Sequence, residues 1–255
     1  MELSINCLNG DCLELMSNLP DKSIDLFLCD LPYGCLTQAR GAIPLGRKQL
    51  SPNTVGCPWD IKIDLEKFWI QVKRLCKNDN TPVLMFCTTL FGIDLINSNR
   101  DWFRYDIVWN KNYGTNFLMA NKRPMASHEM IYVFSKKGAF YKRIDVKVEN
   151  KEAYIKPEGI RAGNCFGNDT VRTGGIQDKR CALSVINFSR SQSKLHPTCK
   201  SIELYKWLIE RYSNEGDTIL DPTAGSFNSG RASMELNRNY IGMEMNKDFY
   251  EKNKI

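Results

Sequence analysis

Several patterns that would place a chain in a familiar class are missing from this sequence. No run approaches the roughly 18 uninterrupted apolar residues that cross a bilayer. The amino terminus, with Glu2 and the polar stretch Asn9-Gly10-Asp11, also lacks the apolar core of a signal peptide. These absences argue against a membrane or secreted protein, and we expect a cytoplasmic one with no membrane contact.

Metal-ligand spacing is missing as well. The ten cysteines include no Cys-x-x-Cys pair, and the two histidines, His128 and His196, lie far apart in the sequence. Cys29 and Cys87 fall inside apolar stretches, where cysteine behaves as a small hydrophobic residue. We therefore predict reduced structural thiols and no metal site.

What the chain does have is an uneven distribution of charge. Its formal net charge is +6, yet residues 136–200 alone hold 14 Lys and Arg against 6 Asp and Glu. Aromatic residues lie among these basic ones, glycines interrupt the segment, and regular periodicity fades between residues 135 and 194. Basic side chains interleaved with aromatic ones are typical of nucleic-acid binding, although a solvated surface would show the same excess of charge.

The rest of the chain alternates short apolar strands with amphipathic helices. Strands are expected near residues 24–29, 81–87, 218–220 and 241–244, and helices near residues 65–75, 202–211 and 227–236. Residues 103–109 and 129–134 read as two strands with no helix between them, which favours an antiparallel hairpin. The predicted fold is therefore α/β, with a doubly wound, mostly parallel sheet, an antiparallel hairpin and a small irregular lobe.

The stretch Asp30-Leu31-Pro32-Tyr33 directly follows the first buried strand. The carboxyl ends of strands are where open α/β sheets bind ligands. Pro32 holds the neighbouring carbonyls out of helical hydrogen bonds, Asp30 adds a carboxylate acceptor, and Tyr33 offers a flat face for stacking. These groups suit an exocyclic amino group on a flat ring, although Asp-x-Pro after a strand is also an ordinary turn. The Gly- and Pro-rich residues 34–60 that follow are a candidate lid or phosphate-contacting arm, and the alternative is a disordered segment without a role.

A second strand end carries a turn of small residues. Asp221-Pro222-Thr223-Ala224-Gly225-Ser226 opens a helix, and the N–H groups of such a turn can cradle a nucleotide. The turn matches neither the phosphate-loop nor the Gly-x-Gly-x-x-Gly pattern. Glu244 follows roughly 20 residues later, the spacing at which an acidic side chain takes a ribose hydroxyl pair. Asp11 also follows a strand end, where it either meets the same crevice or only caps a helix.

Together these motifs resemble the adenine-N6/cytosine-N4 DNA methyltransferases in the permuted (β-type) order, with the catalytic motif first and the cofactor motif last. The resemblance is carried by Asn9-Gly10-Asp11-Cys12, Ser23–Gly34, Trp109-Asn110-Lys111, Arg123-Pro124, His128-Glu129, His196-Pro197-Thr198 with Lys200, Asp221–Ser226, and Glu244. No single segment is decisive, but their joint presence in this order is specific.

The resemblance implies a seven-stranded methyltransferase sheet, S-adenosyl-L-methionine as cofactor, and double-stranded DNA whose target base is flipped out. It makes Asp30, Leu31, Pro32 and Tyr33 the catalytic residues, with Asp30 and the main chain accepting from the amine and Tyr33 stacking on the base. The cofactor-binding residues that it implies are Asp11, His196, Thr198, Lys200, Asp221, Thr223, Gly225, Ser226 and Glu244. It also implies a catalytic part in residues 1–135, a target-recognition insertion in 136–194 and a cofactor part in 195–255.

Departures from the family pattern leave alternatives open. Leu31 replaces the usual first proline, and Thr223 and Phe227 replace the phenylalanine and last glycine of the usual Asp-Pro-Phe-x-Gly-Ser-Gly loop. The acidic Asp30 favours adenine over cytosine N4. The alternatives are a cytosine-N4 or RNA methyltransferase, a protein-glutamine methyltransferase, and a non-catalytic nucleic-acid-binding subunit. The resemblance also makes a homodimer and a partner restriction endonuclease of a restriction-modification system possible partners.

Overall fold

The computed structural model describes residues 3–34, 60–115, 117–147, 154–156, 159–161, 170–172, 175–177, 179–191 and 199–255. The candidate lid, apart from its two end residues, lies outside the described residues, as do His196 and Thr198. The chain divides into two compact units, a larger one of residues 1–142 and 184–255 and a smaller one of residues 143–183.

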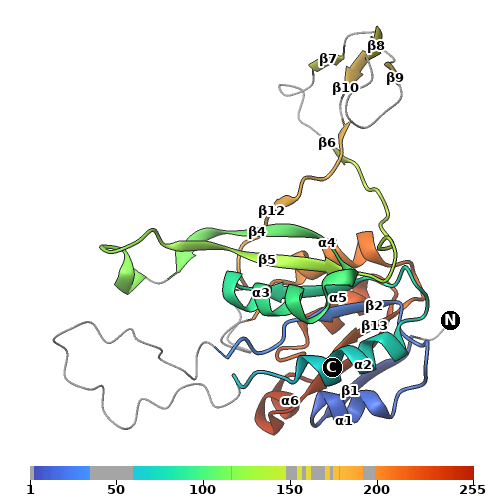
Figure 1. Cartoon of the computed structure of the whole chain (residues 1–255), viewed down its shortest axis with the longest axis vertical. Helices are drawn as coiled ribbons and strands as arrows, with labels where there is room; N and C mark the ends of the chain where they lie inside the picture. The colour runs from blue at the N-terminus through green and yellow to red at the C-terminus, as the bar shows by residue number, and fades with distance from the viewer. Residues whose placement is uncertain are drawn as a thin grey trace. The chain divides into compact units, whose positions relative to one another are not determined.

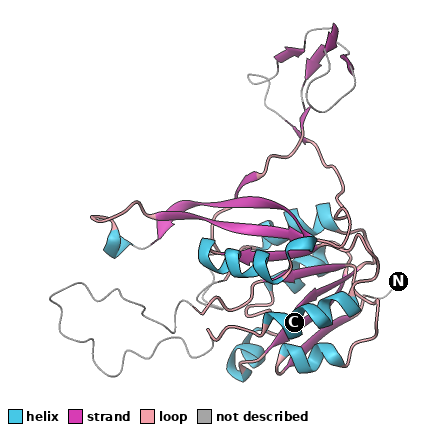
Figure 2. Cartoon of the chain, viewed as in Figure 1, coloured by secondary structure: helices cyan, strands magenta, loops and turns pink. Residues whose placement is uncertain are grey.

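The larger unit is built on an eight-stranded sheet in the order β1-β14-β13-β2-β3-β5-β4-β12 (Figures 1 and 2). Its strands are β1 (Ile5–Asn9), β2 (Leu26–Cys29), β3 (Val83–Cys87), β4 (Phe103–Thr115), β5 (Ala126–Phe134), β12 (Val185–Asn187), β13 (Thr218–Asp221) and β14 (Asn239–Glu244). Neighbouring strands are parallel except that β5 runs antiparallel to both β3 and β4. The mostly parallel sheet with an antiparallel hairpin is thus confirmed. It has one strand more than expected, because β12 adds in parallel to β4.

Helices cover both faces of this sheet. They are α1 (Cys12–Ser17), α2 (Leu65–Leu75), α3 (Thr89–Ser98), α4 (Ile202–Tyr212), α5 (Asn228–Glu235) and α6 (Lys247–Asn253), with 3-10 turns η1 (Arg100–Trp102) and η2 (Phe117–Met119). Helices α1, α2 and α3 supply side chains to one core cluster, and α4 and α5 supply the other. None of the described helices has the length and apolar character needed to cross a membrane.

The central strand β2 shows why the sequence of a buried parallel strand is continuously apolar. Phe27 and Cys29 lie in the cluster on the α2 side, whereas Leu26 and Leu28 lie in the cluster on the α4 side. Because successive side chains of a strand point to opposite faces, a strand covered on both sides has no polar position left. The Asp30 that follows is therefore the first place where the chain can present a carboxylate at the sheet edge.

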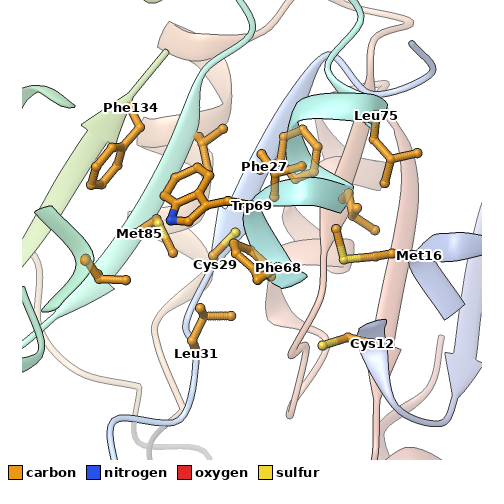
Figure 3. Close-up of a cluster of buried hydrophobic side chains, with 14 of the residues drawn as sticks. Cys12, Met16, Phe27, Cys29, Leu31, Phe68, Trp69, Leu75, Met85 and Phe134 are labelled. Carbon is orange, nitrogen blue, oxygen red and sulfur yellow. The ribbon is translucent and has the colours of Figure 1, made fainter. Parts of the chain in front are cut away.

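Leu31 belongs to the core and not to the surface. It is only 2% exposed and joins the cluster around Trp69, as Figure 3 shows. The Trp69 ring packs 5.2 Å from that of Phe134, and its Nε1 donates to Ser98 Oγ at 2.8 Å. Burying a leucine side chain contributes roughly 1.5–3 kcal/mol. Leu31 therefore anchors the turn by packing, where the family's proline would restrict the backbone directly.

The smaller unit consists of short antiparallel strand pairs. Its strands are β6 (Val146–Lys147), β7 (Tyr154–Lys156), β8 (Gly159–Arg161), β9 (Thr170–Arg172), β10 (Gly175–Gln177) and β11 (Lys179–Arg180). They pair as β6 with β11, β7 with β10 and β8 with β9. This unit lies inside the insertion that we predict at 136–194, but it is shorter at both ends. Phe140 N donates to Asn80 O at 2.8 Å, which holds the first flank on the larger unit.

Charge is distributed differently from what the sequence pattern indicated. Residues 143–183 contain 8 Lys and Arg against 6 Asp and Glu, so the smaller unit has only a small basic excess. The rest of the excess lies in the flanking residues, which belong to the larger unit. Lys136 and Lys137 there pair with Asp79, and Lys200 is buried. The basic excess of residues 136–200 is therefore divided between the two units.

Candidate active site

Three of the predicted site residues come together at one edge of the sheet. Strands β2, β13 and β14 are parallel neighbours, with Leu220 beside Phe27 and Asp221 beside Gly242. Asp30 directly follows β2, while Asp221 and Glu244 are the last residues of β13 and β14. Their carboxyl groups consequently lie along the edge at which α/β sheets bind ligands.

Asp30 and Tyr33 form the first part of this site. The Tyr33 hydroxyl donates to Asp30 Oδ1 at 2.8 Å, and the Tyr33 ring lies 5.2 Å from that of Phe91 at an angle of 30°. Burial and the nearby Asp30 carboxylate raise the pKa of Tyr33 well above its usual value. The phenol therefore remains a proton donor at neutral pH and fixes one oxygen of Asp30.

The second oxygen of Asp30 is held by a buried lysine. Lys200 is 4% exposed, and its Nζ donates to Asp30 Oδ2. The same ammonium lies 3.8 Å from Glu129 Oε2, and Lys111 Nζ contacts Glu129 Oε1 at 3.2 Å. These two lysines and two carboxylates form an alternating cluster of charges, in which each charge has an opposite neighbour.

The charges of this cluster support one another. Burial alone would lower the pKa of Lys200, but Asp30 and Glu129 raise it by more, so that the pKa is above its usual value. Burial acts to raise the pKa of Glu129, but Lys200 and Lys111 lower it by more. The Lys200 ammonium also lies 4.8 Å from the centre of the Phe86 ring. Both groups are therefore ionised at neutral pH.

Glu129 and Lys111 were not among the predicted site residues. Glu129 in β5 pairs with Trp109 in β4, and Lys111 follows Trp109 by two residues. The antiparallel register of the hairpin therefore brings Glu129 and Lys111 to the same edge of the sheet. The available signal was an acidic residue at the start of an otherwise apolar strand. Sequence alone did not supply the register of the hairpin, which decides whether that acid meets Lys111 and Lys200.

Lys200 also contacts, through its main chain, the helix that follows the small-residue turn 221–226. Its carbonyl accepts from Asn228 Nδ2 at 2.8 Å, and Asn228 is the first residue of α5. The next residue, Ser201, caps α4 by accepting from Leu204 N at 3.3 Å. One residue thus joins the tetrad, the start of α4 and the start of α5.

The buried side chain of Asp221 stabilises the turn after β13 by accepting hydrogen bonds. Asp221 is 1% exposed; its Oδ1 accepts from Thr223 N at 3.1 Å and its Oδ2 from Ser229 Oγ at 2.5 Å. Burial raises the pKa of Asp221 to about 7, against the lowering effect of these two hydrogen bonds. Ser226 also faces inward, with its Oγ 3.2 Å from Cys199 Sγ. Both side chains therefore shape the turn and do not line its outer surface.

Glu244 connects this turn to the next strand. Its Oε2 accepts from Gly225 N at 2.9 Å and its Oε1 from Asn246 N at 2.7 Å, while burial raises its pKa. Gly225 has φ +53°, a conformation that glycine adopts without strain. Thr223 Oγ1 is buried and has no hydrogen-bond partner among the described residues. The turn therefore retains an unused donor and acceptor beside a carboxylate.

Asp11 caps a helix at the same edge. Its exposed carboxylate accepts from Leu13 N at 2.7 Å at the start of α1. The preceding Gly10 N donates to Glu244 O at 3.1 Å, so Asp11 lies close to the end of β14. The helix-capping interpretation is thus confirmed, and the second oxygen of the carboxylate remains available.

Phe227 occupies the place of the family's last loop glycine. It has φ 55° and ψ 23°, the left-handed conformation in which a side chain costs about 1–2 kcal/mol. Its ring is fully buried and lies 6.2 Å from that of Tyr250. The aromatic ring therefore points into the core and leaves the turn open, and its burial offsets the backbone strain.

Comparisons with known proteins identify the relatives of this chain. Residues 24–254 match the family model described as DNA methylase. The chain is 26% identical over 260 residues to the type II methyltransferase M.HinfI of Haemophilus influenzae, covering 96% of this chain and 66% of that protein. It is 25% identical over 257 residues to the DNA adenine methyltransferase YhdJ of Escherichia coli (strain K12), covering 95% and 79%. The chain thus spans just under two thirds of M.HinfI.

Solved structures share the fold. The M1.HpyAVI–SAM complex aligns with a TM-score of 0.57 at 21% identity, over 98% of each chain. The cytosine-N4-specific PvuII DNA methyltransferase aligns with a TM-score of 0.62 at 16% identity, over 98% of this chain and 86% of that one. The predicted α/β architecture is therefore that of known methyltransferases.

Removing the buried ammonium tests the charge cluster. Lys200→Met should lower the free energy of unfolding by about 3–5 kcal/mol, because Asp30 and Glu129 are left buried without their cation. The double variant Lys200→Met/Glu129→Gln should recover more than about 1 kcal/mol relative to the sum of the single changes, measured by urea unfolding. Lys62→Met, which removes the exposed pair with Asp94, should cost less than about 1 kcal/mol.

The pH dependence of this loss follows from the two pKa directions. The lowered pKa of Glu129 makes its contribution present above its unfolded value of about 4.3 and lost as the pH falls through the folded value. The raised pKa of Lys200 makes its contribution present below about 10.4 and lost as the pH rises through the folded value. If the losses in free energy of unfolding of Lys200→Met and Glu129→Gln simply add up in the double variant, the coupling between these two residues is contradicted.

Asp221→Asn tests the buried carboxyl group. Since its pKa in the folded protein is about 7, above the unfolded value of about 3.9, the wild type should lose stability as the pH rises between these values. The asparagine variant lacks this loss, so its stability relative to wild type should improve between pH ~4 and pH ~7, by at most about 4 kcal/mol. Urea unfolding at several pH values measures the difference, and parallel pH curves would contradict the shift.

Two substitutions at Phe227 separate its packing from its backbone. Phe227→Ala should cost about 3–5 kcal/mol through the cavity, whereas Phe227→Gly should cost about 1 kcal/mol less because glycine tolerates the positive φ. At Ala232, in the ordinary helix of α5, glycine should instead be worse than alanine by about 1 kcal/mol. Denaturant unfolding of the three variants measures this reversal, and a glycine that is no better than alanine at residue 227 would refute it.

Proposed function

The chain belongs to the DNA methylase family, and we propose that it transfers a methyl group from S-adenosyl-L-methionine to the N6 amino group of adenine in double-stranded DNA. The observation that carries this proposal is the double contact of Lys200. Its ammonium holds Asp30 of the tetrad, and its carbonyl holds Asn228 at the helix behind the small-residue turn. Lys200 thereby fixes the position of Asp30, which would bind the amine, relative to the turn that would bind the cofactor, at one edge of the sheet.

The residues of the turn suit the cofactor. Each carboxylate oxygen of Glu244 accepts one N–H and retains a lone pair for a ribose hydroxyl. The buried Thr223 Oγ1 has no partner among the described residues, and such an atom fits a ligand that hydrogen-bonds at this turn. Bound there, S-adenosyl-L-methionine would supply an electrophilic methyl group. His196 and Thr198, predicted to lie near its methionine end, fall outside the described residues.

Asp11, Asp221, Gly225 and Ser226 contribute in different ways. The exposed Asp11 carboxylate can still accept from the cofactor's adenine. Gly225 brings the backbone close to the ligand, whereas Asp221 and Ser226 hold the turn in shape from inside. Of the predicted cofactor-binding residues, Asp11 and Gly225 would therefore contact the ligand, whereas Asp221 and Ser226 would hold the turn that contacts it.

The tetrad suits an adenine that has left the base stack. Tyr33 is half-buried and can stack on the flipped base, an interaction worth roughly 1–3 kcal/mol. Asp30, oriented by Tyr33 and Lys200, has lone pairs left to accept from the amino group, and the main chain at Leu31 and Pro32 can accept its other proton. The lone pair of the nitrogen would then be free to bond to the methyl carbon, and the bond from that carbon to sulfur would break with its electron pair remaining on sulfur.

One proton must leave the amino nitrogen once the methyl group is attached. Asp30 is the acceptor that this chain provides for that proton, which then passes to water. Lys200 stabilises the negative charge of Asp30 before the transfer and helps to orient its free lone pairs. The reaction requires no metal and no covalent bond to the protein, and positioning with preorganised charge supplies the acceleration.

The acidic first residue of the tetrad favours adenine over cytosine. One of the curated relatives, YhdJ, is named a DNA adenine methyltransferase, which supports the same choice. The inward direction of Phe227 removes one reason for considering a non-catalytic subunit with a degenerate pocket. Double-stranded DNA as substrate, target recognition by the smaller unit, and a location in the cytoplasm belong to this proposal. A homodimer and a partner restriction endonuclease stay predictions.

The experiment that tests the proposal identifies the modified nucleoside. The purified chain is incubated with methyl-labelled S-adenosyl-L-methionine and unmethylated DNA of varied sequence, and the digested nucleosides are separated by mass spectrometry. Label in N6-methyladenine is the expected result. Label in N4-methylcytosine would keep the mechanism and overturn the base, and cofactor binding without any labelled DNA would overturn the substrate.

Asp30→Ala tests the role of the tetrad carboxylate. Loss of this acceptor should lower kcat by at least about 100-fold, while the Kd values of the folded variant for cofactor and DNA change little. The free energy of unfolding should also fall by about 3–5 kcal/mol, because Lys200 loses a buried partner. Asp25→Ala is the matched control, because Asp25 immediately precedes the same strand, at its opposite end, and pairs with Lys77 away from the site. Single-turnover methylation and calorimetry measure both quantities. Full turnover in Asp30→Ala would eliminate this role.

A further inference from the structure

The hairpin tip, residues 113–125, exposes large apolar side chains at the far end of β4 and β5. Phe117 is 77% exposed and Leu118 is 92% exposed, and both lie in the short turn η2. Tyr113 and Met125, which lie on either side of η2 in the sequence, are exposed as well. Apolar groups presented together on a projecting turn are typical of a surface that becomes buried in a partner.

The same tip is basic and has no negative charge in its sequence. Residues 110–128 contain no Asp or Glu, whereas Lys122 and Arg123 are both exposed. At the base of the tip, Arg190 Nη1 donates to the Tyr113 hydroxyl at 2.8 Å. A protein partner with an apolar pocket would not need this charge, but a polyanion would be attracted by it.

The tip extends from the strand ends that carry the active site. Lys111 in β4 and Glu129 in β5 contact each other, and Glu129 contacts Lys200, which holds Asp30. Leu118 follows Lys111 by seven residues and Lys122 precedes Glu129 by seven, and seven residues of extended chain span at most about 25 Å. Figure 1 shows these two strands projecting beyond the body of the larger unit. The tip therefore stays within one helical turn of DNA, about 34 Å, of the charge cluster.

We propose that the hairpin tip is a wedge that opens the DNA stack near the target base, an inference that rests on the proposed function. Phe117 and Leu118 insert between base steps, and Lys122 and Arg123 neutralise the phosphates on either side. Apolar side chains inserted in this way unstack a step and kink the duplex, at a cost that the added phosphate contacts offset. A base next to such a step leaves the helix more easily.

A second copy of this chain fits the tip less well than DNA does. Two tips packed against each other would bring their lysines and arginines together, which like-charge repulsion opposes. The exposed apolar side chains are also few compared with the roughly 20–30 residues that each partner contributes to a stable interface. Charge and size therefore both favour a nucleic-acid occupant.

The test compares two DNA substrates and removes the wedge without touching the site. The substrates are a matched duplex with the methylated sequence found in genomic DNA and the same duplex with a mismatch opposite the target adenine. The double variant Phe117→Ala/Leu118→Ala should lose about 10-fold or more in kcat/KM on the matched duplex. It should lose less than about 3-fold on the mismatched one, where unstacking is already cheap. Ile70→Ala, an exposed isoleucine on α2, is the control and should change neither.

A second readout does not depend on methylation. With 2-aminopurine next to the target position, binding of the wild type should raise the fluorescence, and the wedge variant should raise it much less. The variant Lys122→Ala/Arg123→Ala should instead weaken binding of both duplexes equally and reduce the slope of log K against log salt by about 2.

The remaining outcomes overturn one idea or the other. Equal losses of the wedge variant on both duplexes, or no loss on either, would overturn the wedge. Sedimentation that shows a dimer dissociated by the tip substitutions would overturn it in favour of a second copy. If the wild type methylates neither duplex but still raises the 2-aminopurine fluorescence through its tip, the proposed function fails and the wedge stands.

Discussion

A single buried ammonium group holds the functional edge of this protein together. Lys200 lies between Asp30 and Glu129, has its carbonyl on Asn228, and immediately precedes the cap of α4. A buried charge is tolerated only when it is paired and hydrogen-bonded, so the two carboxylates and the lysine must be placed together or not at all. The position of Asp30 therefore depends on residues from β2, β5 and the start of α4, which are far apart in the sequence.

The other side of the edge is organised by inward-facing polar groups. Asp221 and Ser226 use their side chains to shape the turn, while Glu244 ties Gly225 to the end of β14. The groups that keep hydrogen-bonding capacity at this turn are the remaining lone pairs of Glu244 and Thr223 Oγ1. This division explains how Thr223 and Phe227 can replace more usual residues. The hydroxyl of Thr223 is buried without a hydrogen-bond partner among the described residues, and the ring of Phe227 packs into the core.

Positive charge is distributed over more of the surface than the run of basic residues indicated. The smaller unit carries 8 basic against 6 acidic residues, and several lysines of its flanks are paired or buried. The hairpin tip, by contrast, has a sequence free of acidic residues and combines basic with exposed apolar side chains. Counting charges along the sequence does not identify such a surface. In the folded protein some basic residues pair with acidic ones, as Lys136 and Lys137 do with Asp79, whereas Lys122 and Arg123 are exposed.

The sequence by itself determined the central strands of the larger unit, the helices between them, the mostly parallel sheet and the three carboxylates at its edge, because apolar runs and strand-end motifs are local properties of the chain. It also determined the family, through motifs spread over most of the length. Only the tertiary structure decided that Lys200 contacts Asp30, that Glu129 and Lys111 join them, and that β12 extends the sheet. Those facts depend on strand register and on which buried charges meet, and residues between 18 and 170 positions apart must come together before either is settled.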